Sequence, residues 1–445
     1  PAPKKPRKGH GRNGLPPALP RDTTVSDPPA EQLVCSCGRC LEKIGEETSE
    51  QLDYRPAMFR VRRRVRSNWA CSRCRSAVVT APTPVMPIEK GLATAALIAY
   101  VIVSKFADHL PLNRLRLIFE RHGVPVAPST MGGWVEAAAL LLEPIVLAMR
   151  SCALSGRKLH VDATPVPVLD KTRNQTREAQ LWVLVGDEQN PFTVFVYCPD
   201  KQFGPIAKLL AGFRGFLQAD AAPGYDRLFA SGAILEVGCR AHARRKIYET
   251  LPAGGLAALV PLSYIRQLYD IEKEARNLGL DFEARAKLRQ EKAVPILAGL
   301  NAWIDEETGR TLPESALGKA LAYSVNHRAA LDRYVEHGFL EIDNNPAERQ
   351  LRRIAVGRAN WTFAGSDRGG RAAATLYSLV ATCQRHGVEP WAYLADVLER
   401  VSTHPASRVE ELFPQNWAEA RRHDVEVAHS PPETAQPEIT YEAQL

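Results

Sequence analysis

Five short apolar runs decide the fold of this chain: KLHVDATPVPVL (158–169), QLWVLVGD (180–187), PFTVFVYC (191–198), GFLQAD (215–220) and AILEVGC (233–239). They are rich in β-branched and aromatic residues and are bounded by turn residues, as β-strands are. Helical stretches separate the third run from the fourth (203–213) and the fourth from the fifth (225–232). This order predicts an α/β fold with a mixed sheet, whose first three strands pair as hairpins and whose later strands follow crossovers.

Outward from these strands, the character of the chain changes several times. Residues 113–137 (NRLRLIFERHGVPVAPSTMGGWVEA) contain a helix, a Gly turn and a second helix start at Ser129-Thr130, as a helix-turn-helix does. Gly132 and Gly133 weaken the second helix, so we favour a structural helical connector over a DNA reader.

We expect seven segments along the chain. In order, they are a basic proline-rich linker, a zinc-binding module, a helical region with the helix-turn-helix candidate, the first part of the catalytic core, a helical insertion, the last part of the core, and a C-terminal segment with a disordered tail. They cover residues 1–33, 34–82, 88–150, 155–245, 246–335, 336–402 and 403–445.

The overall composition is that of a globular protein. Hydrophobic residues make up 45% and charged residues 24%, which excludes fibrous and wholly disordered classes. The longest strongly apolar run, residues 92–103, is too short for the roughly 20 residues of a bilayer helix, so we expect neither a membrane span nor a secretory signal. The net charge of +7 is a weak indication of a polyanionic partner. Because the first methionine is Met58, we expect a part upstream of Pro1.

Cysteines cluster near the N-terminus, five of the nine lying between Cys35 and Cys74. Such clustering indicates a metal site in a reducing compartment and not a disulfide framework. The pairs Cys37/Cys40 and Cys71/Cys74 can close one tetrahedral structural Zn²⁺ site, with Cys35 as an alternative ligand. Buried free thiols are the other interpretation.

A basic strand is expected next to these cysteines, because residues 59–74 alternate in polarity. Arginines share one of its faces and would contact DNA phosphates, or else form a solvated surface: Arg60, Arg62, Arg64 and Arg66.

Two acidic residues stand out by position, since Asp162 ends the run KLHVD and Asp220 ends GFLQAD. Carboxylates at the ends of neighbouring buried strands lie where α/β sheets bind ligands, and they can share two Mg²⁺ ions. A third carboxylate must come from elsewhere, and composition alone does not choose it; Glu341, Asp343 and Glu348 are candidates within eight residues. Asp343 suits a helix cap before Pro346, whereas Glu348 is inside the helix, on a face with Leu351 and Ala355 that we expect to pack on the sheet.

Several long motifs in fixed order make the chain resemble the transposases of the IS66 insertion-sequence family: HVDATP, LQADAAPGYD, GCRAHARRK, IDNNPAERQLRR and NWTFAGSDRGG. The N-terminal cysteine region resembles that family's zinc finger, although CSCGRC departs from its usual first knuckle and the family's N-terminal coiled-coil-like segment is absent. The resemblance implies an RNase H-like catalytic domain with a DDE triad, matched here by Asp162, Asp220 and Glu348.

The family also implies cofactors and partners. These are two catalytic Mg²⁺ ions (or Mn²⁺), DNA at element ends and target, a homodimer or larger synaptic complex, companion proteins of the element, and the nucleoid of the bacterial cytoplasm.

Further residues are expected beside the carboxylates. Cys239 and His242 match a CxxH motif of several DDE transposase groups, with His242 near the scissile phosphate; the alternative is core packing and helix capping. Basic side chains would bind flanking phosphates: Arg244, Arg245, Lys246, Arg349, Arg352 and Arg353. Two other functions stay open, a noncatalytic zinc-containing DNA-binding protein derived from a transposase and a plain RNase H-like nuclease.

Overall fold

The computed structural model describes residues 59–63, 68–70, 78–80, 86–88, 91–170, 172, 175–220, 223–230 and 232–429. The chain divides into two units, Pro1–Arg64 and Val65–Leu445. The five cysteines of the expected zinc module, together with Arg64 and Arg66, lie outside the described residues, as does the tail after residue 429.

The expected basic strand is wrong at the positions that the structure describes. Residues 59–63, which include Arg60 and Arg62, form no strand, and the side chain of Val61 is 96% exposed. A strand requires a ladder of backbone hydrogen bonds to a neighbouring strand, and residues 59–63 belong to no such ladder. The nearest strand is β1 (Asn68–Ala70), which pairs antiparallel with β2 (Val78–Thr80).

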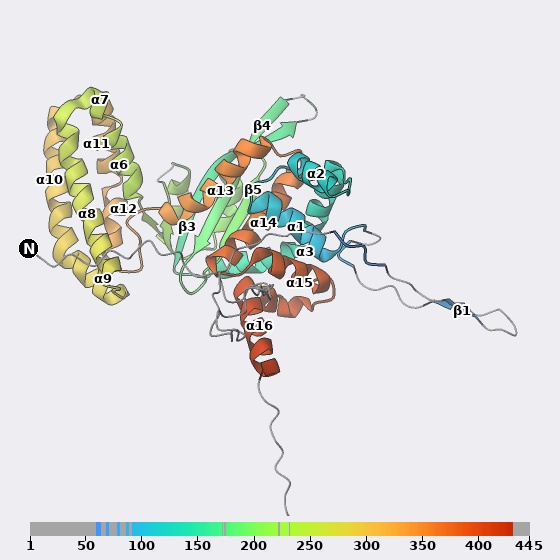
Figure 1. Ribbon diagram of the computed structural model, residues 1–445. Helices are drawn as coiled ribbons and strands as arrows, with labels where there is room; N and C mark the ends of the chain where they lie inside the picture. Colours follow the sequence, from blue (N-terminus) through green and yellow to red (C-terminus); the bar gives the residue numbers. More distant parts are fainter. Residues whose placement is uncertain are drawn as a thin grey trace, which may run out of the picture. The chain divides into compact units, whose positions relative to one another are not determined.

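A five-stranded mixed sheet forms the centre of the second unit (Figure 1), as predicted. Its order is β5-β4-β3-β6-β7, in which β3, β4 and β5 are antiparallel hairpin partners and β6 and β7 run parallel to β3. Short helices α4 (Gly204–Leu210) and α5 (Asp226–Phe229) make the crossovers. The strands are β3 (Lys158–Asp170), β4 (Gln175–Gly186), β5 (Thr193–Cys198), β6 (Gly215–Gln218) and β7 (Ile234–Val237).

The β3–β4 hairpin is longer than the apolar runs predict. β4 begins at Gln175, five residues before the predicted run, and pairs with Asp170 at the far end of β3. The polar residues QTREA join the strand because the second half of β3 offers them a backbone ladder.

Helix α14 (Asp367–Arg385) closes the edge of β5. The backbone N–H groups of Thr193 and Phe195 donate to the hydroxyls of Thr382 (3.1 Å) and Ser378 (2.8 Å), which lie one turn apart on the helix. These bonds satisfy donors that an open edge would present to other chains.

Helices before and after the sheet pack together. α3 (Pro128–Leu154) contacts α14 and the strands β4 and β5, while α1 (Ala95–Phe106) contacts α15 (Pro390–Arg400). α2 (Leu112–Arg121) precedes a turn at Gly123, which adopts a φ of +74°. The remaining C-terminal elements are η6 (Ala406–Leu412) and α16 (Pro414–His429).

The second helix of the helix-turn-helix candidate is this long helix α3. It begins at Pro128 without a side-chain cap, so Ser129-Thr130 is not its start, and it runs through Gly132 and Gly133. Buried residues line it from Met131 to Ala153, which favours the connector interpretation. α3 is also the one described helix that is long and apolar enough to cross a membrane by length and composition alone, a property that buried core helices share.

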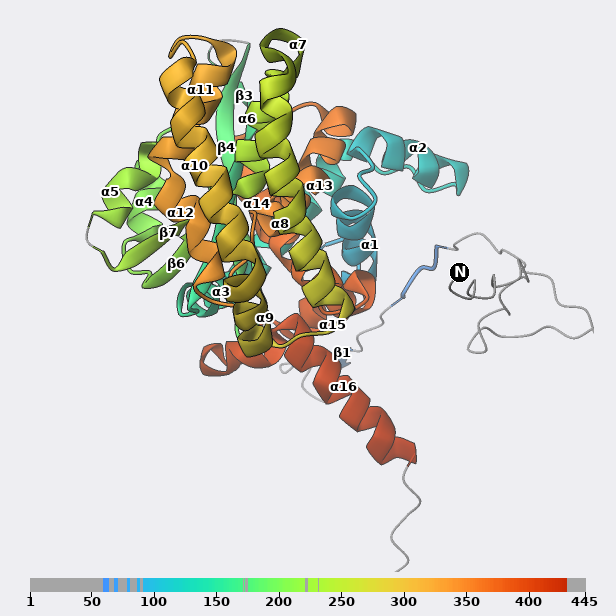
Figure 2. The same cartoon turned by 90° about the vertical axis from the view of Figure 1, so that its left-hand side faces the viewer.

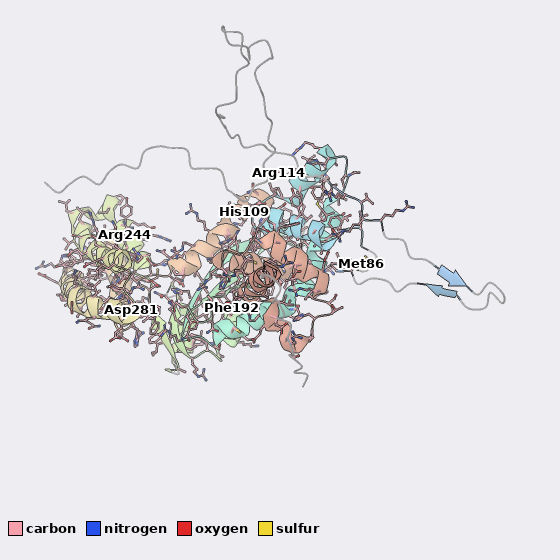
Figure 3. The ribbon with its side chains drawn as sticks, turned by 60° about the horizontal axis from the view of Figure 1, so that its bottom comes forward. Met86, His109, Arg114, Phe192, Arg244 and Asp281 are labelled. Atoms are coloured by element: carbon pink, nitrogen blue, oxygen red, sulfur yellow. The ribbon has the colours of Figure 1, made fainter. Side chains whose placement is uncertain are left out.

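A helical insertion separates β7 from α13 (Asn345–Trp361). Figure 2 views it face on, with α8, α10 and α11 side by side. Figure 3 shows Arg244 and Asp281 on it, apart from His109, which lies between α1 and α2, and from Arg114 of α2. Its helices share a hydrophobic core that includes Leu268, Leu300 and Leu321. The elements are α6 (Arg240–Tyr248), α7 (Leu251–Gly254), η3 (Gly255–Ala258), α8 (Leu259–Asn277), α9 (Phe282–Leu288), η4 (Arg289–Ala293), α10 (Val294–Arg310), α11 (Ala316–Asn326), α12 (Arg328–Asp332) and η5 (Arg333–Val335).

Candidate active site

The first two candidate carboxylates occupy equivalent positions on neighbouring parallel strands. His160 of β3 pairs with Gln218, the last residue of β6, and Asp162 and Asp220 each follow two residues later. The sequence predicts Asp162 at the end of its strand, and this prediction is wrong, because β3 continues alongside β4 to Asp170. It nevertheless lies just beyond the point where the parallel neighbour ends, so the two carboxylates lie at the same edge.

Glu348 reaches the site from the first turn of α13, which packs against β3 and β4. The buried face of this helix consists of Ala347, Leu351, Ile354 and Gly357, while Ala355 is exposed. The expected packing face of Leu351 with Ala355 is therefore wrong for Ala355. Glu348 lies beside the buried face and is partly exposed, with 26% of its side-chain area open to solvent.

Electrostatics links the three acidic residues. Burial, with the nearby negative charges of Asp220 and Glu348, raises the pKa of Asp162 to about 7, although the Ala163 N–H and the charge of Arg245 oppose the rise. Nearby like charges favour a proton or a bound cation at a partly buried carboxyl group. Three carboxylates supply the hard oxygen ligands that Mg²⁺ prefers, so the donor set fits this ion.

Glu348 also lies close to a thiol, an imidazole and a guanidinium group from the start of α6. Its Oε1 lies 3.5 Å from Nδ1 of His242 and 3.9 Å from Sγ of Cys239, and its Oε2 lies 4.0 Å from Arg245. Among the described residues, Cys239, His242 and Glu348 are the group whose possible metal-ligating atoms all lie within 4.8 Å of one another. Burial raises the pKa of the Cys239 thiol to about 12, so without a cation beside it this thiol is protonated.

Asn344 fixes the start of α13 against the sheet. Its side chain is fully buried; Nδ2 donates to the carbonyl of Val161 (2.9 Å), and Oδ1 lies 3.0 Å from Nδ1 of His160. Because Oδ1 can only accept, His160 is the donor, and burial lowers the pKa of this imidazole to about 3, so it is neutral. The backbone N–H of Asn344 donates to Sγ of Cys239 (3.2 Å). We call Asn344, His160 and Cys239 the neutral clamp.

The same segment is held on its other side by buried charges. The Arg289 guanidinium, with no exposed area, bonds the Glu272 carboxylate and the carbonyls of Tyr334, His337 and Leu340. Arg285 bridges Glu272 (2.6 Å) and Glu341 (2.9 Å). We call Glu272, Arg285, Arg289 and Glu341 the ionic clamp.

The two other acidic candidates for the third position are engaged elsewhere. Glu341 belongs to the ionic clamp. Asp343 is buried and accepts the Tyr269 hydroxyl (2.8 Å) and the Asn345 N–H (3.1 Å). The expected cap at Asp343 is wrong, because α13 has Asn344 as its N-cap and no side-chain cap.

The basic residues predicted near the site divide into two groups. Arg244, Arg245 and Lys246 are exposed on α6; Arg244 and Lys246 lie over the rings of Tyr248 and Tyr323, and Arg245 approaches Glu348. On α13, Arg349 and Arg352 are exposed, while Arg353 is half-buried and donates to Gln350.

Residues that the sequence did not single out complete the site. Asn344 and His160 are part of the quoted motifs IDNNPAER and HVDATP, but their mutual contact spans 184 residues. Tyr225 is buried among Trp182, Phe203 and Phe229, and burial, with the charges of Asp220 and Asp162, raises its pKa well above the usual value. Tyr225 likewise belongs to a quoted motif, LQADAAPGYD, but its aromatic surroundings come from separate segments.

Comparisons with known proteins match nearly the whole chain. The family model for the transposase IS66 family covers residues 90–372, that for the IS66 C-terminal element covers 378–415, and that for the zinc-finger binding domain of transposase IS66 covers 32–75. Similar relatives come from Sinorhizobium fredii (strain NBRC 101917 / NGR234). "Uncharacterized protein y4jD" is 34% identical over 418 residues, covering 91% of this chain and 81% of the relative. "Uncharacterized protein y4qI" is 35% identical over 430 residues, covering 93% and 78%.

Proposed function

Since this chain belongs to the IS66 transposase family, we propose that it cuts the ends of an insertion element and joins them to target DNA. The sheet order and the carboxylates on β3, after β6 and on α13 support an RNase H-like DDE catalytic domain. In this proposal Asp162, Asp220 and Glu348 hold two Mg²⁺ ions (or Mn²⁺).

The observation that carries the proposal is the coupling of the three carboxylates. They come from three separate elements, yet the charges of Asp220 and Glu348 both raise the pKa of Asp162. Glu348 has two basic neighbours among the described ion pairs, His242 at 3.5 Å and Arg245 at 4.0 Å, both from the start of α6.

The chain's own residues have distinct roles in the proposed reaction. When bound, the metal pair would stabilise the charge that develops on the attacking and leaving oxygens. The three carboxylates hold that pair, and the neutral clamp keeps Glu348 facing the strand carboxylates. Arg245 would contact a phosphate that flanks the cut, and His242 would lie beside it. Water cuts the element strand and frees a 3′-OH, which then attacks a target phosphodiester, so that one P–O bond forms as another breaks.

The test is a cleavage and joining assay with DNA that carries candidate element ends. We expect Asp162→Asn, Asp220→Asn and Glu348→Gln each to abolish Mg²⁺-dependent cutting while DNA binding persists. Glu336→Gln is the matched control, because Glu336 is exposed between η5 and α13 and does not belong to the site. Cutting by Glu348→Gln would remove Glu348 from the triad.

The N-terminal region extends the proposal to zinc and partners. The zinc-finger match contains all five clustered cysteines, so we propose one structural Zn²⁺ held by Cys37, Cys40, Cys71 and Cys74, with Cys35 as the alternative ligand. Joining two ends in one event would need a homodimer or larger synaptic complex, with companion proteins of the element, on the bacterial nucleoid. Metal analysis and sedimentation of the DNA complex test these points.

The alternative is a noncatalytic DNA-binding protein derived from a transposase. It predicts DNA binding without any Mg²⁺-dependent cutting by the unmodified chain. A plain nuclease would cut without joining. The same assay therefore separates all three functions.

A further inference from the structure

A polar pocket lies beside α13, and none of the three carboxylates lines it. It encloses about 360 Å³ between the start of β3, the end of β4, α13 and the last turn of α14. From α13 it is lined by Arg349, Gln350 and Arg353, which share one side of the helix, whereas Glu348 does not line it. The pocket is therefore a separate compartment of the same helix.

The charge balance of this pocket favours an anion. Four cationic residues line it (Lys158, Arg349, Arg353 and Arg385) against two acidic residues (Glu188 and Glu341), so the lining carries a net charge of 4 − 2 = +2. Both carboxylates already have partners: Glu188 binds the buried Lys158 ammonium (2.8 Å), and Glu341 binds Arg285 outside the pocket (2.9 Å). Among the described ion pairs, the three arginines have no carboxylate partner, although Arg353 and Arg385 donate to neighbouring oxygens.

Two of these arginines are held in place by neighbouring groups. Arg385 donates to the carbonyls of Gly186 (3.0 Å) and Phe192 (3.1 Å), and Nε of Arg353 donates to Gln350 (3.0 Å). Their guanidinium groups are oriented before any ligand arrives, which reduces the entropy that binding loses. The planar fork of a guanidinium matches the oxygens of a phosphate group.

We propose that this pocket binds a backbone phosphate of the DNA strand that is processed at the carboxylates. The inference rests on the proposed function, since it takes the occupant to be DNA. Glu348 and Arg349 are consecutive on α13, so a strand whose phosphate lies at the carboxylates passes close to the pocket. A terminal phosphate or a free phosphate ion has the same chemistry, and the experiment separates these sources.

The test introduces a negative charge into the pocket by an isosteric change. Gln384 lines the pocket from the exposed face of α14, and its described hydrogen bonds involve only its backbone, so Gln384→Glu should preserve the fold. Gln267→Glu, on the exposed face of α8, is the control with the same change in charge. Binding of a short single-stranded oligonucleotide with a 5′-hydroxyl is measured in EDTA at several salt concentrations.

We expect Gln384→Glu to weaken binding severalfold and to reduce the slope of log K against log salt by about 0.7, the contribution of one phosphate contact on a single strand. Gln267→Glu should match the unmodified chain, and Arg349→Gln, an exposed substitution, should repeat the loss. Equal slopes for Gln384→Glu and Gln267→Glu would overturn the proposal. So would a loss seen only with a 5′-phosphorylated oligonucleotide, or only in thermal stabilisation by inorganic phosphate, because the site would then hold a terminal or free phosphate.

These readouts are independent of catalysis. If the chain never cuts DNA but its DNA binding responds to Gln384→Glu as expected, the phosphate pocket is supported and the proposed function is contradicted. A chain that cuts DNA in an Asp162-dependent manner, but binds equally well with Gln384→Glu, retains the function and loses the pocket.

Discussion

The two clamps that hold the segment before Glu348 are built from opposite chemistry. On the sheet side, Asn344, His160 and Cys239 make a buried, uncharged network. On the insertion side, Glu272, Arg285 and Arg289 make a buried, charged one. A buried ion close to the three carboxylates would shift their pKa values. An amide and a neutral imidazole orient α13 without such a shift, so the charged network is on the insertion side.

Removing Arg289 should have the largest effect on the free energy of unfolding, because it breaks the ionic clamp. Arg289→Met leaves the Glu272 carboxylate buried with one cation fewer and frees three backbone carbonyls, so we expect a loss of about 3–5 kcal/mol. Hydrogen exchange should show the loss in the insertion first. The double variant Glu272→Leu/Arg289→Met should recover much of it, since no buried charge is left without its partner. A single variant as stable as the parent would contradict this view of the ionic clamp.

Removing Asn344 should cost less stability and more activity. Asn344→Ala leaves the donor of His160 and the carbonyl of Val161 without partners, for which we expect about 2–3 kcal/mol. Loss of its position on β3 should also move Glu348, with a fall in cutting of about a hundredfold. Asn360→Ala, exposed at the other end of α13, is the control for urea unfolding and for cutting. If both variants cut equally, the neutral clamp does not position the carboxylate.

Acid should weaken the two clamps in different pH ranges. Burial lowers the pKa of His160 to about 3, below its unfolded value of 6.5, so the unfolded chain binds the proton first and stability falls as the pH drops below 6.5. Burial alone would raise the pKa of Glu272, but its bonds to Arg289 and Arg285 hold it below the ordinary 4.5, so that contribution is lost only at lower pH.

At pH 5 we therefore expect a loss of about 2 kcal/mol from the neutral clamp alone. Urea unfolding in EDTA, with and without His160→Gln, measures it. A pH dependence that His160→Gln leaves unchanged between pH 7 and 5 would assign the loss to another group.

The smallest effect separates packing from hydrogen bonding at Cys239. Cys239→Val keeps the volume but removes the acceptor of the Asn344 N–H, so we expect about 1–2 kcal/mol. Cys239→Ser keeps an acceptor and should lose less. Equal losses in urea unfolding would show that this thiol only fills space.

The sheet was predictable because its signals are local, and much of the site was not. The hairpin pairing of the first three strands, the crossovers and the position of Asp220 follow from short apolar runs, whereas Asp162 lies inside a strand that continues beyond its run. By contrast, Asn344 meets His160 across 184 residues, and no short pattern marks such a pair.

In helix α13, the sequence pattern did not identify all the residues that pack against the rest of the protein. Placing Ala355 on the packing face failed because the helix is rotated so that Gly357 is buried instead. A Cβ there would lie only 2.7 Å from Nε1 of Trp361, so the close approach requires a glycine. The polar start of β4 was missed for a related reason, since its residues pair only because β3 extends beside them.

The long insertion between β7 and α13 has a consequence for synthesis of the protein. Asp162 and Asp220 leave the ribosome well before Glu348, with 348 − 220 = 128 residues still to be translated. At roughly 5–20 residues per second, that interval lasts about 6–26 s. During this time the nascent chain carries two of its three carboxylates and cannot complete the triad. Catalytic competence thus arrives only after the insertion has been made, so an interrupted or truncated translation product yields a chain that cannot cut DNA.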